Sequence, residues 1–301
     1  MRSDANRGRL DARPTALLVI AVVLAACTLP GGAPDAPADE AAVGAEGQGR
    51  TIAYGDGPEQ VADLALPAGS APDAGWPTVV LVHGGFWRDQ YRRDLMADLA
   101  RDLANRGFAS WNLEYRRVGP TGGGFPGTLL DVAAGTDHLA AVAEEAPIDL
   151  DRVAVVGHSA GGHLALWFGS RGRLPAGAPG ASDPLRPCAV VAQAPVASLV
   201  DAVPLGDGAV TDFLGGEPDE VADRYAIADP MALVGHGVPV LLVHGRSDET
   251  VPVDQSERYE AAASAAGDPV ELVTGAGDHF AVIDPGDPLW DAQVGFLERH
   301  C

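Results

Sequence analysis

Residues 155–162 read VVGHSAGG, a serine set among glycines directly after two valines. A valine-rich run at residues 153–156 leads into Gly157-His158-Ser159-Ala160-Gly161, and a helix-forming run, HLALWF at residues 163–168, follows. A strand, a tight turn with an exposed serine and a helix, in this order, form a nucleophile elbow. Side chains two residues before and after the serine would clash in that turn, so glycine at both positions meets a steric demand. A chance match in a chain with 38 glycines is the alternative, and the strand and helix argue against it.

Strand-like and helix-like runs alternate from residue 60 onward, which predicts an α/β fold. We expect a mostly parallel, twisted sheet of about eight strands with helices on both faces. The expected strands are Val61–Leu66, Thr78–Val82, Phe108–Leu113, Arg152–Val156, Ala189–Gln193, Pro239–Val243 and Val270–Val273. The main expected helices are Asp94–Asn105, Thr128–Glu145, the run after the elbow, Asp254–Ala266 and Trp290–Arg299. Short helical pieces broken by Gly and Pro at residues 203–234 predict a small cap.

A serine hydroxyl is a weak nucleophile near neutral pH, so it needs a base, and the base needs an orienting acid. In a sheet of this kind the acid and then the base follow the serine along the chain. Asp248 lies just beyond the expected strand that ends at Val243, and His279 follows the last strand in a glycine-rich loop. We therefore predict a triad of Ser159, Asp248 and His279. Glu249 is the competing acid, and Asp248 could instead serve as a turn or helix-cap residue.

Ester hydrolysis also needs backbone donors for the oxyanion that forms when the carbonyl is attacked. The Ala160 amide, at the start of the helix after the elbow, would be one donor. Residues 82–87 read VHGGFW, so an expected strand runs into two glycines. This is similar to the HGGG-type oxyanion loop, with Phe86 in place of the third glycine. The amides of Gly85 and Phe86 are the other predicted donors; a simple glycine turn is the alternative.

The first 27 residues read as an export signal. Four arginines (Arg2, Arg7, Arg9 and Arg13) precede an apolar run from Thr15 to Ala26 that is too short to span a bilayer. Leu24-Ala25-Ala26-Cys27 resembles a bacterial lipobox, so we predict a lipoprotein signal peptide at residues 1–27 with Cys27 lipidated. An ordinary secretory signal with an incidental Cys27 is the alternative. The lipid would anchor the chain to the cell membrane at its extracytoplasmic face.

Residues 28–50 are rich in Ala, Gly, Pro, Asp and Glu and predict a flexible tether, and residues 51–301 have the length of one large α/β domain. The net charge of −22 disfavours nucleic acid and anionic headgroups as partners. The sequence has no lysine, which excludes a P-loop lysine, a Schiff-base lysine and a Ser-Lys dyad. No Cys/His spacing suggests zinc, and we expect neither metal nor cofactor. The sequence leaves open whether Cys188 and Cys301 pair, and it leaves the oligomeric state open too.

Residues 60–301 resemble the α/β-hydrolases of the esterase/lipase and kynurenine formamidase type, the BD-FAE group of feruloyl and acetyl-xylan-like esterases included. The matching pieces are HGGFW at 83–87, GHSAGG at 157–162, Asp248 before Val251-Pro252, and GDH at 277–279. The HGGxW form is associated with formamidase-like members, which implies a small aromatic or acylated substrate. Trp87 would then either form one wall of the substrate pocket or pack the oxyanion loop. His158, at the variable elbow position, is a second candidate pocket residue.

The leading hypothesis is a serine hydrolase that cleaves a small-molecule carboxylic ester through an acyl-enzyme. An arylformamidase acting on an N-formylkynurenine-type amide is the first alternative, and the export signal argues against it. An exopeptidase related to prolyl oligopeptidases shares the triad order, but we expect no propeller-sized segment ahead of residue 51. An inactive hydrolase fold kept as a binding module is the last alternative. The sequence does not fix the acyl group or the leaving group.

Overall fold

The computed structural model describes residues 49–119, 122–181 and 185–301. The predicted signal peptide, Cys27 and nearly all of the predicted tether lie outside the described residues. Among the helices of the described ranges, none is long and apolar enough to cross a membrane.

An eight-stranded sheet organises the described chain, in the order β1-β2-β4-β3-β5-β6-β7-β8. Strands β3 to β8 pair in parallel, and β1 and β2 are antiparallel to their neighbours. The predicted mostly parallel α/β sheet is therefore confirmed. The strands are β1 Arg50–Ala53, β2 Val61–Ala65, β3 Trp76–Val82, β4 Ala109–Leu113, β5 Ile148–His158, β6 Ala189–Gln193, β7 Val240–Gly245 and β8 Val270–Gly275.

Strand β1 is the one strand that the sequence pattern did not predict, and it begins at Arg50, inside the segment predicted as tether. It has four residues at the edge of the sheet, and three of them are exposed. An exposed edge strand needs no apolar side chains, so it leaves no hydrophobic pattern to read.

The helices match the predicted runs with one correction. The α-helices are α1 Ala97–Asn105, α2 Gly127–Asp137, α3 Leu139–Val142, α4 Ala160–Gly169, α5 Ala209–Leu214, α6 Ala222–Ala228, α7 Asp254–Ala266 and α8 Pro288–His300. The described residues also form four 3-10 helices: η1 Arg93–Met96, η2 Arg171–Arg173, η3 Pro230–Leu233 and η4 Ala281–Ile283. The predicted cap of short helical pieces at 203–234 corresponds to α5, α6 and η3.

The single helix expected at Thr128–Glu145 is instead the pair α2 and α3, interrupted at His138. The Trp111 indole donates a hydrogen bond of 2.8 Å to the Gly135 carbonyl, which a continuous helix would offer to the Leu139 amide. A Cβ at Gly135 would also lie 2.4 Å from a Leu113 methyl, so glycine lets α2 pack tightly on β4. Tertiary packing thus overrides the helical pattern at this point.

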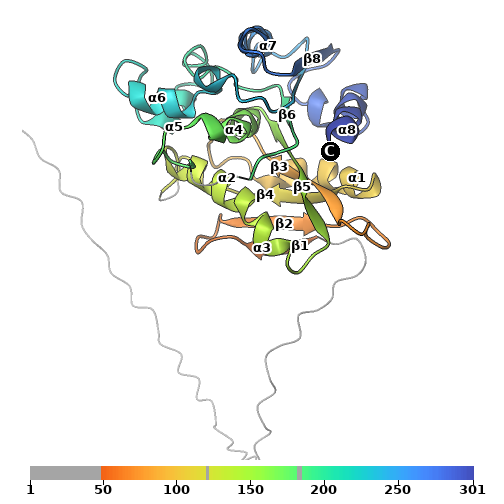
Figure 1. Cartoon of the computed structure of the whole chain (residues 1–301). Coiled ribbons are helices and arrows are strands. Elements are labelled where there is room, and N and C mark those ends of the chain that lie inside the picture. Colours follow the sequence, from red (N-terminus) through yellow and green to blue (C-terminus); the bar gives the residue numbers. More distant parts are fainter. Residues whose placement is uncertain (1–48, 120–121, 182–184) are drawn as a thin grey trace, which may run out of the picture. The chain divides into compact units, whose positions relative to one another are not determined.

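Side chains alternate between the two faces of the sheet, and each face has its own core. Along β3, Val79 and Leu81 belong to one buried cluster with α1 and α8, while Val80 and Val82 belong to the other with α2 and α4. Figure 1 shows α1 and α8 on one side of the central strands and α2 and α4 on the other. The parallel strands are covered on both faces, so their carboxyl ends form one exposed edge where a site can gather.

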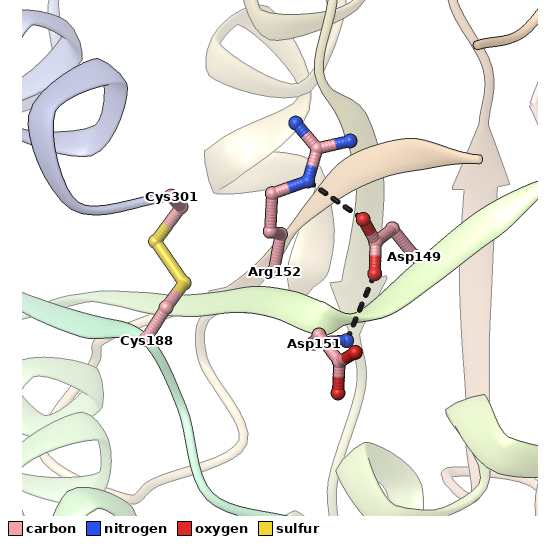
Figure 2. Close-up of a disulfide and its surroundings, with 5 residues drawn as sticks. All are labelled: Asp149, Asp151, Arg152, Cys188 and Cys301. Carbon is pink, nitrogen blue, oxygen red and sulfur yellow. Dashed lines mark hydrogen bonds and ion pairs between the residues drawn. A yellow bond between two sulfur atoms is a disulfide. The ribbon is translucent and has the colours of Figure 1, made fainter. Parts of the chain in front are cut away.

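A disulfide joins Cys188, just before β6, to Cys301, the residue after α8 (Figure 2). The pairing that the sequence left open is thus present in the structure. It ties two segments 113 residues apart in sequence, beside the first residues of β5, where Arg152 pairs with Asp149. Helix α8 also contacts β6 through Gln293, whose side-chain oxygen accepts a hydrogen bond of 2.6 Å from Gln193. The C-terminal helix is therefore fixed to the central sheet at both ends of β6.

Candidate active site

Ser159 lies in the turn between β5 and α4 with a backbone φ of 58° and ψ of −118°. Few non-glycine residues adopt this conformation, and its strain is typical of a nucleophile elbow. The Ser159 amide donates to Gln193 O at the end of β6, 2.7 Å away, and the Ser159 carbonyl accepts from the amides of His163 and Val196. The strained residue is thus held in place from both the neighbouring strand and the following helix.

The glycines around Ser159 are required by contacts that no side chain could share. A Cβ at Gly157 would lie 2.0 Å from Gly161 O, and a Cβ at Gly161 would lie 2.1 Å from Val82 O. The clash that the sequence predicted at these two positions is therefore real in the structure, and any larger residue would push the elbow away from β3.

His279 and Asp248 form a hydrogen-bonded pair at the carboxyl ends of β7 and β8. The His279 Nδ1–H donates to Asp248 Oδ2 over 2.6 Å, and the amides of Thr250 and Val251 donate to Asp248 Oδ1 over 2.8 and 2.9 Å. Burial alone would raise the pKa of Asp248, but hydrogen bonds from His244, His279 and the Val251 amide hold it well below its usual range. Asp248 is therefore an ionised acceptor that orients the imidazole.

The His279 ring contacts the elbow at His158, the residue before Ser159. The two imidazole centroids are 4.6 Å apart, and the His158 Nε2–H donates to the His279 carbonyl over 2.9 Å. No hydrogen bond joins Ser159 to His279 within the described residues, and His279 Nε2 has no partner there. This nitrogen is free to take up a proton, as a base requires.

The loop after β3 lies directly against the elbow. A Cβ at Gly84 would lie 2.9 Å from Ser159 Cβ, so only glycine allows this approach. The next three residues, Gly85, Phe86 and Trp87, all have positive φ angles, of 110°, 52° and 55°. The amides of Gly85, Phe86 and Ala160 donate to no other group in the described part of the chain. Three unused donors beside the serine are what an oxyanion site needs.

A buried ionic cluster, which the sequence did not predict, supports the loop that follows β3. His83 Nε2 donates to Glu114 Oε1 over 3.0 Å, and Arg117 pairs with the same carboxylate. Tyr115 stacks on the His83 ring at 4.3 Å and donates to the His83 carbonyl. Burial alone would raise the pKa of Glu114, but the His83 hydrogen bond and the charge of Arg117 keep it below its usual range. The loop geometry is therefore fixed by charged groups.

Trp87, one of the two candidate pocket residues, is fully buried. Its indole stacks on Phe213 of α5 at 4.7 Å and donates to His163 Nδ1 over 3.2 Å. Of the two roles considered for it, packing of the oxyanion loop agrees with this position, and forming a wall of an open pocket does not. Phe213, which buries Trp87, lies more than 120 residues later in the chain, so the sequence around Trp87 does not show this burial.

His158, the other candidate pocket residue, is also buried. Burial and the nearby His279 lower the pKa of His158 to about 3, so its ring is neutral near neutral pH. The buried His158 ring donates to the His279 carbonyl and so links the elbow to the loop that carries His279. It does not offer a surface to a substrate. Glu249, the competing acid, is exposed and makes no contact with His279 among the described residues.

The site holds no evident place for a metal. Within the described ranges, no group of three or more His, Cys, Asp or Glu side chains is arranged to bind one. What the arrangement offers is a serine, an oriented imidazole and backbone donors.

The chain is similar to known esterases. A family model described as BD-FAE matches residues 62–262. The chain is 26% identical over 266 residues to the isoprenylcysteine alpha-carbonyl methylesterase ICME of Arabidopsis thaliana, covering 80% of this chain and 58% of that protein. It is 28% identical over 252 residues to the esterase LipC of Mycobacterium tuberculosis, covering 78% of this chain and 60% of that protein. The chain thus spans only 58% and 60% of the length of these curated relatives.

Among solved structures, the thermophilic esterase Est2 of the Planctomycetes species Thermogutta terrifontis superposes with a TM-score of 0.68 at 21% identity. The match covers 84% of this chain and 91% of that one. At this identity the likeness establishes the fold, and the family-model match extends over most of the described sheet. The chain has the α/β-hydrolase fold and belongs to the BD-FAE family.

Proposed function

We propose that this protein is a serine hydrolase that cleaves a small carboxylic ester through an acyl-enzyme. The observation that carries the proposal is the meeting of three features at one edge of the sheet: the strained Ser159, the His279–Asp248 pair and the three unused amides. The esterase names of the two curated relatives support the same reaction class.

In the proposed reaction, Ser159 Oγ attacks the ester carbonyl while His279 Nε2 takes the hydroxyl proton. The oxyanion accepts hydrogen bonds from the amides of Gly85, Phe86 and Ala160. His279 then returns the proton to the departing alcohol, which leaves the acyl group on Ser159. Water, deprotonated by His279, hydrolyses that acyl-enzyme. Asp248 stays ionised and keeps His279 Nδ1 protonated, so that Nε2 remains the basic nitrogen.

The side chains around the site favour an ester with an apolar or aromatic part. Phe280 is 45% exposed and lies edge-on to the His279 ring, and Tyr91 is 41% exposed and lies where a side chain at Gly85 would be. The arylformamidase alternative rests on the HGGxW form, whose tryptophan, Trp87, is buried against Phe213 and therefore adds no aromatic surface for a substrate.

A substrate panel tests the proposed function. We expect kcat/KM for p-nitrophenyl acetate and butyrate to exceed kcat/KM for N-formylkynurenine by at least about 100-fold. A burst of p-nitrophenol would be seen if hydrolysis of the acyl-enzyme is the slow step. Long-chain esters, acetylated sugars and aminoacyl p-nitroanilides complete the panel. A preference for N-formylkynurenine, or cleavage of the anilides alone, would contradict the ester proposal. No turnover and no labelling by a fluorophosphonate would instead indicate the inactive binding module.

We also propose that the enzyme is exported and anchored through Cys27. The sequence of residues 1–27 supports export, and the Cys188–Cys301 disulfide supports an oxidising compartment. Expression of the full chain in a bacterial host with an alkyne-palmitate label tests this. The wild type should carry the label and stay with the membrane fraction, and Cys27→Ser should carry none. A wild type that is unlabelled and released as a soluble periplasmic protein would contradict the anchor and favour an ordinary secretory signal.

A further inference from the structure

A second histidine contacts the Asp248 carboxylate besides His279. His244 is the second-last residue of β7. Its Nε2 lies 3.2 Å from Asp248 Oδ2, the same oxygen that accepts from His279 Nδ1. The side chains of His244 and Asp248 are both fully buried. Asp248 Oδ2 therefore lies between two imidazoles, and Oδ1 is occupied by the amides of Thr250 and Val251.

The orientation of the His244 ring is fixed at both nitrogens. Its Nε2 lies 2.8 Å from the Val251 carbonyl, which can only accept, so Nε2 carries a proton. Its Nδ1 lies 2.8 Å from the hydroxyl of Ser256, a fully buried residue on α7, which donates to it. The Nε2–H consequently points between Val251 O and Asp248 Oδ2. The Val251 carbonyl thereby selects the tautomer that offers a donor to the acid, and the Ser256 hydroxyl satisfies the other ring nitrogen.

We propose that His244, held by the Val251 carbonyl and Ser256, is a positioning residue for the acid: its Nε2–H holds the Asp248 carboxylate in line with His279 and offsets part of the negative charge that faces His279. This inference rests on the proposed function, because it assigns the role of a residue to the same site.

The role has a consequence for the pH dependence of catalysis. Among the described residues, the titratable side chains that face Asp248 are His244 from β7, His279 from the loop after β8, and His158 from β5. A donor hydrogen bond from His244 weakens the field of the carboxylate at His279. Without it, Asp248 would stabilise protonated His279 more strongly, and the base would become available only at higher pH.

His244→Phe tests this because it keeps a ring in the space and removes the donor. We expect kcat per active site to fall about 10- to 100-fold with KM changed less than about 3-fold, as for loss of a group that acts in the transition state. The acid limb of the kcat/KM profile should move to higher pH by about half a pH unit or more. Active sites are counted with a fluorophosphonate, so a misfolded fraction does not enter the rate. His244→Gln, which restores an N–H near the Nε2 position, should recover much of the rate and the wild-type limb.

His236→Phe is the matched control, because the His236 ring also lies near a carboxylate, that of Asp268 at 3.8 Å. His236 precedes the amino end of β7, whereas the site lies at the carboxyl end. This variant should lower the melting temperature and leave the pH profile unchanged. If His244→Phe does not fold, Ser256→Ala should move the acid limb in the same direction by a smaller amount. An acid limb that is unchanged or lower in His244→Phe or Ser256→Ala would overturn the inference while the wild type is still labelled and active. A wild type without labelling or turnover would instead refute the proposed function.

Discussion

Ser159→Ala is expected to lower the hydrolysis of p-nitrophenyl acetate by about 10⁴-fold or more, because it removes the atom that forms the acyl-enzyme. The amides of Gly85, Phe86 and Ala160 would remain, so a small residual rate above that of the uncatalysed reaction should persist. The measurement is the initial rate at saturating ester, with the melting temperature as a check on folding. Losing one buried hydroxyl should change stability little, since no hydrogen bond from Ser159 Oγ is present among the described residues.

Ser247→Ala is the matched control for this prediction. Ser247 also lies beyond the carboxyl end of β7, in the loop that carries Asp248, and it is exposed. Its variant should keep the wild-type rate within about 2-fold, as is usual for a surface change away from the reacting atoms. If Ser159→Ala kept more than a tenth of the rate, another nucleophile would have to be sought.

Asp248→Asn should give the second-largest loss, about 10³- to 10⁴-fold in kcat. The carboxamide retains the shape of the side chain but can present an NH₂ group to His279 Nδ1. The imidazole would then carry its proton on Nε2, facing the serine, and could not act as the base. Since the pKa of Asp248 is held well below its usual range, mild acid does not reproduce this variant, and the loss should persist across the neutral pH range.

Glu249→Gln separates the two candidate acids. Glu249 is adjacent in sequence, exposed and without contact to His279 in the described chain, so its variant should stay within a few-fold of wild type. Steady-state kinetics of both variants from pH 6 to 9 make the comparison. The reverse result, with Glu249→Gln inactive and Asp248→Asn active, would show that the acid was misassigned.

Much of this site could be predicted from the sequence because each part follows a strand. The carboxyl ends of parallel strands meet at one edge, so residues 83–87, Ser159, Asp248 and His279 are brought to the same edge once the strands are recognised. The elbow could be predicted from a short stretch of sequence, because the contacts that require glycine at positions 157 and 161 arise within the turn itself and from the adjacent strand β3. Edge strand β1 was not readable, because its exposed residues carry no apolar pattern.

The contacts that support the site were not predictable, because they join residues distant in sequence. His83 meets Glu114 31 positions later, and the burial of Trp87 depends on Phe213. The role proposed for His244 depends on Ser256 of α7 and on the conformation of the loop between them. A pattern of residue types along the chain fixes which strand end a residue follows, but not which polar partner its side chain finds.

Covalent labelling tests most directly whether Ser159 is the nucleophile. The wild-type protein is treated with diisopropyl fluorophosphate, its intact mass is measured, and the modified peptide is sequenced by tandem mass spectrometry. One adduct per chain on Ser159, absent from Ser159→Ala and slowed in Asp248→Asn, is the expected result. An unmodified wild type, or an adduct on a different residue, would contradict the assignment of Ser159.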